Sequence, residues 1–151
     1  FIEAAERALQ EGITVFTDTK MVLSGINKPA LSKTKNTLLC LIDDDEVLNL
    51  SAKNGTTRSS AAVDLAVQGG ASAFVIGNAP TALFRLLELY AEGKISPRFV
   101  VGVPVGFVGA AESKKALGLT AVPHICTRGT KGGSTVAASI INALLYMQTG
   151  R

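Results

Sequence analysis

The stretch "RFVVGVPVGFVGAAESKKALG", residues 98 to 118, contains the unit that decides the fold. Its first part, "RFVVGV", is a run of β-branched and aromatic residues that predicts a buried strand, and "AAESKKALG" predicts a helix. The turn between them contains Gly106 and Gly109 but no acidic, basic or thiol side chain. Such a turn either serves packing or lets the backbone lie close to a ligand.

The same strand-to-helix pattern recurs along the whole chain. Apolar, β-branched runs predict strands at residues 13–17, 37–42, 71–77, 98–103 and 121–127. Helical spacing predicts helices within residues 1–11, 18–23, 43–55, 56–70, 78–93, 110–118 and 128–150. Asp18 is the expected cap of the second helix and Thr56 or Thr57 that of the fourth, with a loop at 27–36. Near-continuous apolar strands between helices indicate an α/β fold, a parallel sheet with helices on both faces.

The composition bounds the class of protein. The 151 residues are 47% hydrophobic and 18% charged, which indicates a single globular α/β domain over residues 1–151. The net charge of +3 is too small to indicate nucleic-acid binding, and 5% aromatic residues provide no platform for stacked bases. No apolar run approaches the length of about 20 residues that a membrane span needs. We therefore expect neither a nucleic-acid nor a membrane partner.

The cysteines and the start of the chain give two further expectations. Cys40 and Cys126 lie inside apolar runs, which favours buried, reduced thiols in a cytoplasmic protein over a disulfide between them. No secretory signal is visible.

The chain opens at Phe1 inside the amphipathic run "FIEAAERALQEG" without a capping residue. We therefore expect that a natural N-terminal segment precedes it.

Ligands of open parallel sheets bind beyond the carboxyl ends of the strands, and the segments predicted there combine glycines, hydroxyls and cations. Glycines let backbone N–H groups approach a ligand, and helix N-termini add partial positive charge. Lys20, Arg58, Arg128 and Lys131 add full charges. The prediction is a broad anion-binding site fed by several loops. Its candidate residues are Asp18, Lys20, Thr57, Arg58, Ser59, Gly77, Asn78, Gly106, Gly109, Arg128, Gly129, Gly133 and Ser134.

Several motifs admit other interpretations. Neither "TRGTKGGST" (127–135) nor "GVPVGFVG" (102–109) has the spacing of a phosphate-binding loop, so a nucleotide site is weakly supported. The run "DDDE" (43–46) is more often an acidic first turn of a helix than a metal site. His124 is the only histidine, and its place within a strand favours a core or edge position over a catalytic one. No catalytic triad and no metal-ligand cluster can be argued.

Five segments carry a resemblance to a known family. They are "FTDTKMVLSGI" (16–26), "NGTTRSSAAVDL" (54–65), "GNAPTALFRLLE" (77–88), "PVGFVGAAESK" (104–114) and "RGTKGGST" (128–135). In this order they resemble the precorrin-8X methylmutase family, also called precorrin isomerase or cobalt-precorrin-8 methylmutase. The likeness covers nearly the whole chain, and the third segment followed by the fourth is its most specific part.

The resemblance implies a flavodoxin-like fold and a reaction. The family is an isomerase of cobalamin biosynthesis that moves a methyl group on ring C of precorrin-8X, or of its cobalt counterpart. The product is hydrogenobyrinate or cobyrinate, and the family consumes no cofactor or methyl donor. A corrinoid macrocycle that carries many carboxylates would explain a site of glycine turns, helix N-termini and cations. The family's catalytic histidine lies upstream of the segment that Phe1 begins, and His124 does not match its motif, so no catalytic residue is assigned.

Two other functions stay open at this point. One is a corrinoid-binding relative that performs no catalysis, and the other is a flavin- or nucleotide-binding domain of the flavodoxin-like class. The sequence also leaves open whether the macrocycle carries cobalt.

The resemblance implies a homodimer, and the last helix fits an interface. Between Lys131 and Arg151 there is no charged side chain, and a surface helix normally has a polar face. We expect the subunits to meet at this helix or at "TALFRLLELY" (81–90).

Overall fold

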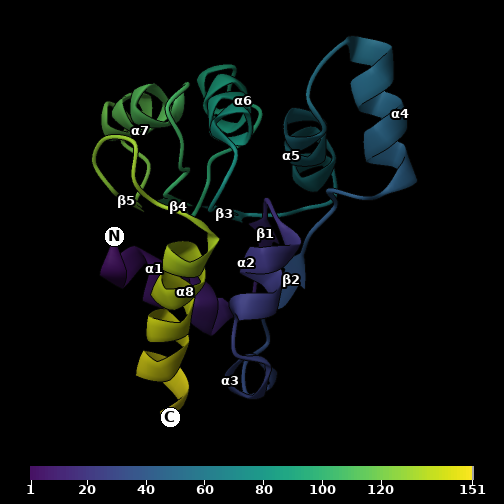
Figure 1. The fold of residues 1–151 in the computed structure, drawn as a ribbon. Helices are drawn as coiled ribbons and strands as arrows, with labels where there is room; N and C mark the ends of the chain where they lie inside the picture. Colours follow the sequence, from purple (N-terminus) through teal and green to yellow (C-terminus); the bar gives the residue numbers. More distant parts are fainter. Residues whose placement is uncertain (151) are drawn as a thin grey trace.

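The computed structural model of the protein describes residues 1–150. Within these residues, five strands form one sheet in the order β2-β1-β3-β4-β5 (Figure 1). The strands are β1 (Thr14–Thr17), β2 (Thr37–Leu39), β3 (Ala73–Ile76), β4 (Phe99–Gly102) and β5 (His124–Cys126). All neighbouring pairs are parallel. This strand order is the flavodoxin-like form of the doubly wound fold, so the predicted fold class is confirmed.

Helices cover both faces of the sheet and make three layers (Figure 1). One layer contains α1 (Ile2–Glu11), α2 (Lys20–Gly25), α3 (Lys28–Ser32) and α8 (Ser134–Thr149). The opposite layer contains α4 (Asp45–Asn54), α5 (Arg58–Gln68), α6 (Pro80–Ala91) and α7 (Ala110–Gly118).

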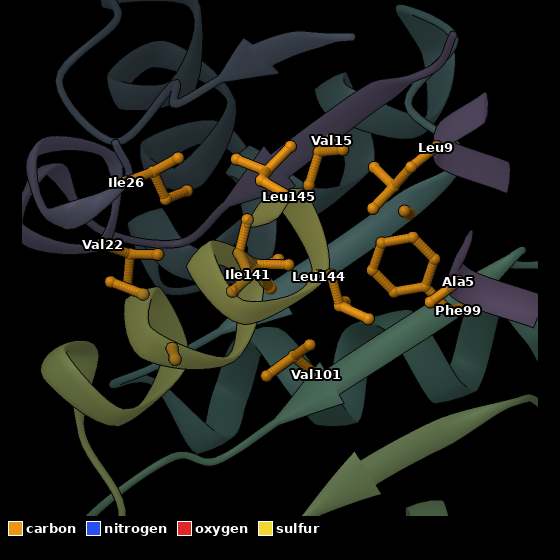
Figure 2. Packing of buried hydrophobic residues seen from close by; sticks show 14 of the residues in the cluster. Ala5, Leu9, Val15, Val22, Ile26, Phe99, Val101, Ile141, Leu144 and Leu145 are labelled. Carbon is orange, nitrogen blue, oxygen red and sulfur yellow. The ribbon is translucent and has the colours of Figure 1, made fainter. Parts of the chain in front are cut away.

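Each central strand contributes to two cores, because neighbouring residues of a strand point to opposite faces. On the α8 side, Val101 lies in one buried cluster with Ile141 and Leu144 (Figure 2). On the other side, Val100 lies in the cluster that includes Leu83 of α6. Burial on both faces explains why the strands are near-continuous apolar runs in the sequence.

Two predicted local features are wrong. Asp18 does not cap α2, because Thr19 does so with its side-chain oxygen, which accepts a hydrogen bond from the Val22 N–H at 3.2 Å. The expected loop at 27–36 contains the short helix α3, which Asn27 caps. Asparagine is a strong N-cap, and the proline that suggested a loop lies in the first turn, where its missing N–H costs nothing.

The edge strands are shorter than predicted. The apolar run at 37–42 forms a strand only as far as Leu39, and the run at 121–127 only from His124 to Cys126. Pro123 has no N–H for a ladder, although its carbonyl accepts a bond from the Val100 N–H at 2.9 Å. His124 therefore lies on an edge strand, as predicted, and its Nδ1 lies 2.7 Å from the Val122 carbonyl oxygen.

Cys40 and Cys126 are both free thiols, as predicted, but each is partly exposed, not buried. Over residues 1–150, no helix combines the length and apolar character that crossing a bilayer would require.

Candidate functional site

The carboxyl ends of all five strands meet at one edge of the sheet, because every neighbouring pair is parallel. Direct contacts join the segments that follow them. The Thr57 hydroxyl at the start of α5 lies 3.1 Å from the Thr81 hydroxyl in the first turn of α6. A Cβ added to Gly109 would lie 3.3 Å from the Cβ of Pro80. The Gly106 N–H donates to the Thr130 carbonyl at 3.0 Å. The structure therefore brings residues 57, 80, 106, 109 and 130 into one continuous surface.

The turn between β4 and α7 presents apolar side chains to solvent. Phe107 is 94% exposed and Val108 is 89% exposed, and Val105 beside them is 40% exposed. We call residues 105–108 the apolar tip. Exposed large apolar groups that lie together are typical of interaction surfaces. Phe107 and Val108 are not among the residues predicted from the sequence, although apolar side chains inside a glycine turn are a signal that indicates them.

Gly106 within the apolar tip and Gly109 directly after it have backbone conformations that other residues rarely adopt. Gly106 has φ of 134° and Gly109 has φ of 84°. A Cβ at Gly106 would meet nothing within 4 Å, whereas one at Gly109 would crowd Pro80 and lie 3.5 Å from Phe84. Glycine is therefore required here by the backbone and, at Gly109, by packing on α6. Gly109 precedes α7 without capping it through a side chain, so the first N–H groups of α7 have no side-chain cap.

The turn between β3 and α6 is closed by Asp18. The Asp18 carboxylate accepts hydrogen bonds from the backbone N–H groups of Gly77, Asn78 and Ala79 at 2.8, 2.9 and 2.8 Å. Only 1% of Asp18 is exposed. Burial raises the pKa of the Asp18 carboxyl, and the three donors oppose this rise. Asp18 was predicted to contact the ligand, but in this geometry it shapes the turn and occupies the donors that an anion would need.

Two more predicted residues are enclosed. Gly77 is buried, and a Cβ there would lie 2.7 Å from Val22 Cγ2 and 2.8 Å from Ser134 Cα. Ser134 is 9% exposed, and its hydroxyl lies 3.0 Å from that of Thr19. Both residues lie where α2, α8 and β3 pack together, whereas Asn78 beside them is exposed.

Asp43 draws two of the predicted cations together. It forms an ion pair with Lys20, and its Oδ1 lies 3.8 Å from Nη1 of Arg58. The hydrogen bond and charge of Lys20 lower the pKa of Asp43, and Asp43 raises the pKa of Lys20 in return. All three side chains are more than half exposed, so these pairs can open to admit a carboxylate ligand.

The start of α5 is well ordered by hydroxyl groups. Thr57 is the N-cap, as one of the two predicted alternatives, and its Oγ1 accepts from the Ser60 N–H at 3.1 Å. Ser59 is half-buried in the first turn, beside the exposed Arg58. Arg58 near a helix N-terminus opposes the helix dipole, which favours a role in binding an anion.

The loop after β5 lies against the β4–α7 turn. The Gly133 N–H donates to the Val103 carbonyl at 2.9 Å. A Cβ at Gly132 would lie only 2.2 Å from that same oxygen, so no other residue fits there. Arg128 and Gly129 are exposed, and Arg128 forms no ion pair with any residue in the described part of the chain. Arg128 is thus available to an anionic ligand.

The acidic run 43–46 behaves as the sequence predicted. Asp45 and Glu46 occupy the first turn of α4, where acidic side chains complement the helix dipole. Within residues 1–150, no three His, Cys, Asp or Glu side chains come close enough together to hold a metal ion.

Comparison with known proteins identifies relatives over almost the whole chain. Residues 1–147 match the family described as "CbiC: Precorrin-8X methylmutase". The cobalt-precorrin-8 methylmutase of Salmonella typhimurium is 51% identical over 141 residues, which are 92% of this chain and 65% of that protein. That of Methanothermobacter thermautotrophicus is 45% identical over 148 residues, 97% of this chain and 68% of that protein. The chain thus spans about two thirds of the length of these curated relatives.

A solved structure gives the same result. A "precorrin-8X methylmutase related protein" superimposes with a TM-score of 0.89 at 34% sequence identity, over 97% of this chain and 77% of that one.

Proposed function

The chain belongs to the precorrin-8X methylmutase family, and we therefore propose that the protein is an isomerase of cobalamin biosynthesis. The reaction moves a methyl group on ring C of precorrin-8X or cobalt-precorrin-8 and gives hydrogenobyrinate or cobyrinate. The observation that carries the proposal is the match of residues 1–147 to the family. The surface at the carboxyl edge supports it, because its parts suit a macrocycle with a flat ring and a rim of carboxylates.

The apolar tip is proposed to contact the flat face of the macrocycle. Phe107 and Val108 are the largest apolar side chains at this edge that are almost fully exposed. Covering them with a ligand removes apolar surface from water, which is favourable. Gly106 and Gly109 give the turn its backbone shape. The first N–H groups of α7 lie beside the apolar tip, where they can bind a carboxylate.

The rim carboxylates are assigned to the exposed cations. A guanidinium holds a carboxylate with two parallel hydrogen bonds, which favours Arg58 and Arg128 over a lysine for this role. Lys20, Asn78 and the backbone at Gly129 supply further polar contacts. The remaining predicted residues shape the segments that carry the cations and polar contacts. They are Asp18, Thr57, Ser59, Gly77, Gly133 and Ser134.

The reaction is an intramolecular transfer, so it consumes neither a methyl donor nor a redox cofactor.

We propose that the protein is cytoplasmic. Its two free thiols agree with this, because reducing compartments keep cysteines unpaired.

We also propose a homodimer that uses the outward side of α8. Ala137, Ile141 and Leu144 face the sheet core, while Val136 and Met147 are 36% and 56% exposed on the other side. The alternative helix, α6, has the charged Arg85 and Glu88 on its accessible side, where they pair with each other at 2.8 Å. An uncharged outward surface favours α8. Light scattering at micromolar concentration should give twice the mass of the chain, and a monomeric mass would refute this assembly.

Turnover is the test of the proposed reaction. The full-length protein is supplied with precorrin-8X in one cuvette and cobalt-precorrin-8 in another. It should convert at least one of them, with the change in the visible spectrum that accompanies hydrogenobyrinate or cobyrinate formation. Binding of the product without any conversion of either substrate would favour the non-catalytic relative. If the protein neither binds nor converts a corrinoid, the proposal is refuted.

A further inference from the structure

Lys114 of α7 is a buried cation whose ammonium reaches the loop after β5. The residue is 3% exposed, and burial lowers its pKa. Its Nζ donates to the Lys131 carbonyl at 2.7 Å and to the Thr127 hydroxyl at 3.1 Å. Thr127 Oγ1 donates in turn to the same Lys131 carbonyl at 2.6 Å. Three polar groups thus close a small network across residues 127–131.

A buried ammonium is costly unless its environment compensates the charge. No carboxylate of residues 1–150 forms an ion pair with Lys114. The compensation therefore comes from the two loop oxygens, and the loop must keep them in place. A hydrogen bond to a charged group is stronger than one between neutral groups, so the ammonium is a firm attachment point for this loop.

The attachment extends to the apolar tip. One residue before Lys131, the Thr130 carbonyl accepts the Gly106 N–H at 3.0 Å. Two residues after it, the Gly133 N–H donates to Val103, at the start of the same turn, at 2.9 Å. Gly132 also lies against Val103, since a Cβ at Gly132 would come within 2.2 Å of the Val103 carbonyl oxygen. Displacement of Lys131 would therefore displace both the loop and the tip.

We infer that Lys114 is a positioning residue, whose buried ammonium fixes the loop 127–133 and, through it, the β4–α7 turn in the arrangement that receives the ligand. Lys114 itself does not touch the ligand. The consequence for corrinoid binding rests on the proposed function, whereas the consequence for the loop does not.

Hydrogen exchange of Lys114→Met tests the loop directly, because methionine fills similar space without charge or donors. The Gly106 and Gly133 amides should exchange about tenfold faster or more than in the wild type, as expected when hydrogen bonds to a charged group are lost. Lys115→Met is the matched control, since Lys115 is the next residue of the same helix and is exposed. The control should exchange at the wild-type rate, and Tm should change little in either variant, because replacing a buried charge by an apolar group is often neutral for stability.

Thr127→Val provides a second variant that removes the other member of the network and keeps the shape of the side chain. It should also speed exchange of the Gly133 amide. In the double variant Lys114→Met/Thr127→Val, the increase in exchange rate should be smaller than the product of the two single increases, because both side chains bind the Lys131 carbonyl. If Lys114→Met does not fold, Thr127→Val alone decides. Unchanged exchange at Gly106 and Gly133 in Thr127→Val, or in a folded Lys114→Met, would overturn the inference.

Ligand binding separates this inference from the proposed function. Lys114→Met should weaken the affinity for hydrogenobyrinate about tenfold while Lys115→Met leaves it unchanged. Faster exchange with undiminished corrinoid affinity would show that the loop is held by Lys114 but is not needed for the ligand, which contradicts the positioning role. If the wild type binds no corrinoid and the exchange effect is present, the proposed function fails and the attachment stands.

Discussion

The β3–α6 and β4–α7 turns both contain glycine, follow neighbouring strands and precede helices that have no side-chain cap. They differ in what their backbone N–H groups contact. At the β3–α6 turn, the buried Asp18 carboxylate accepts all three backbone N–H groups of residues 77–79. At the β4–α7 turn, no side chain caps α7 and the apolar tip extends into solvent. The first turn satisfies itself from within the fold. In the second, the first N–H groups of α7 have no side-chain cap and the apolar tip is exposed, and we propose that a ligand covers both.

The comparison shows that a glycine after a parallel strand does not by itself mark a binding site. What distinguishes the two turns is that a buried side chain, Asp18, binds three consecutive N–H groups of the first turn, whereas no side chain caps the helix that follows the second. Gly77 is required because the space beyond it is filled by Val22 and Ser134, and Gly106 because its backbone has a positive φ with open space around it. Four predictions, beginning with the largest effect, test this contrast.

Asp18→Asn should break the closed turn. An amide places donors where the carboxylate now accepts three N–H groups, so the free energy of unfolding should fall by about 3 kcal/mol. Asp45→Asn, an exposed change in the first turn of α4, is the control and should cost about 0.5 kcal/mol. Urea unfolding followed by circular dichroism measures both. Equal losses in the two variants would mean that Asp18 does not hold the β3–α6 turn.

Alanine at the two glycines should separate packing from backbone strain. Gly77→Ala inserts a Cβ at 2.7 Å from Val22 and should cost about 2–3 kcal/mol. Gly106→Ala meets no atom within 4 Å and should cost about 1 kcal/mol through its φ alone. The same unfolding experiment compares them. A larger loss at Gly106 would reverse the roles assigned to the two turns.

Arg58→Ala should weaken hydrogenobyrinate binding by about 2 kcal/mol, the usual size for a hydrogen bond to a charged group. Arg58→Lys should recover only part of the loss, because an ammonium cannot form two parallel bonds to one carboxylate. Visible absorbance titration gives the affinities, with Lys53→Ala, an exposed lysine in the last turn of α4, as the control. Equal affinities for Arg58→Ala and the wild type would exclude Arg58 from the site.

Phe107→Ser should reduce corrinoid affinity by about 1.5 kcal/mol, the low end for covering an exposed Phe side chain, without changing stability by more than about 0.5 kcal/mol. Leu119→Ser is the matched control, since Leu119 is 91% exposed at the other end of α7. It should leave the affinity unaltered. If both variants lose affinity to the same degree, the effect reflects α7 as a whole and not the apolar tip.

The architecture could be predicted from the sequence, because the strand and helix periodicities are clear. Apolar strands that alternate with helices indicate a parallel sheet with helices on both faces. The central strands were found near their observed bounds, and Thr57 was one of two expected caps. Local errors arose where short polar signals compete, as at Asn27, whose capping of α3 outweighed the loop signal of "NKP".

The site was only partly predictable, because its residues meet through the fold and not along the chain. Asp18 lies about sixty residues from the turn it closes, so its type and position alone suggested a ligand contact. Lys114 and Lys115 look alike in a helical pattern, and only the packing of α7 against the loop after β5 distinguishes the buried one. The exposure of Arg58 and Arg128 was predictable, because a charged side chain in a loop or a first helical turn is rarely buried, and their contact with a ligand stays a prediction.

Hydrogen exchange with and without hydrogenobyrinate tests most directly the claim that the open turn is the ligand surface. At a corrinoid concentration that saturates the visible absorbance change, amides in residues 105–112 and 127–131 should become protected, while the Gly77, Asn78 and Ala79 amides, already bonded to Asp18, should change little. Protection confined to the β3–α6 turn, or saturable binding with no change at residues 105–112, would show that the β4–α7 turn is not the ligand surface.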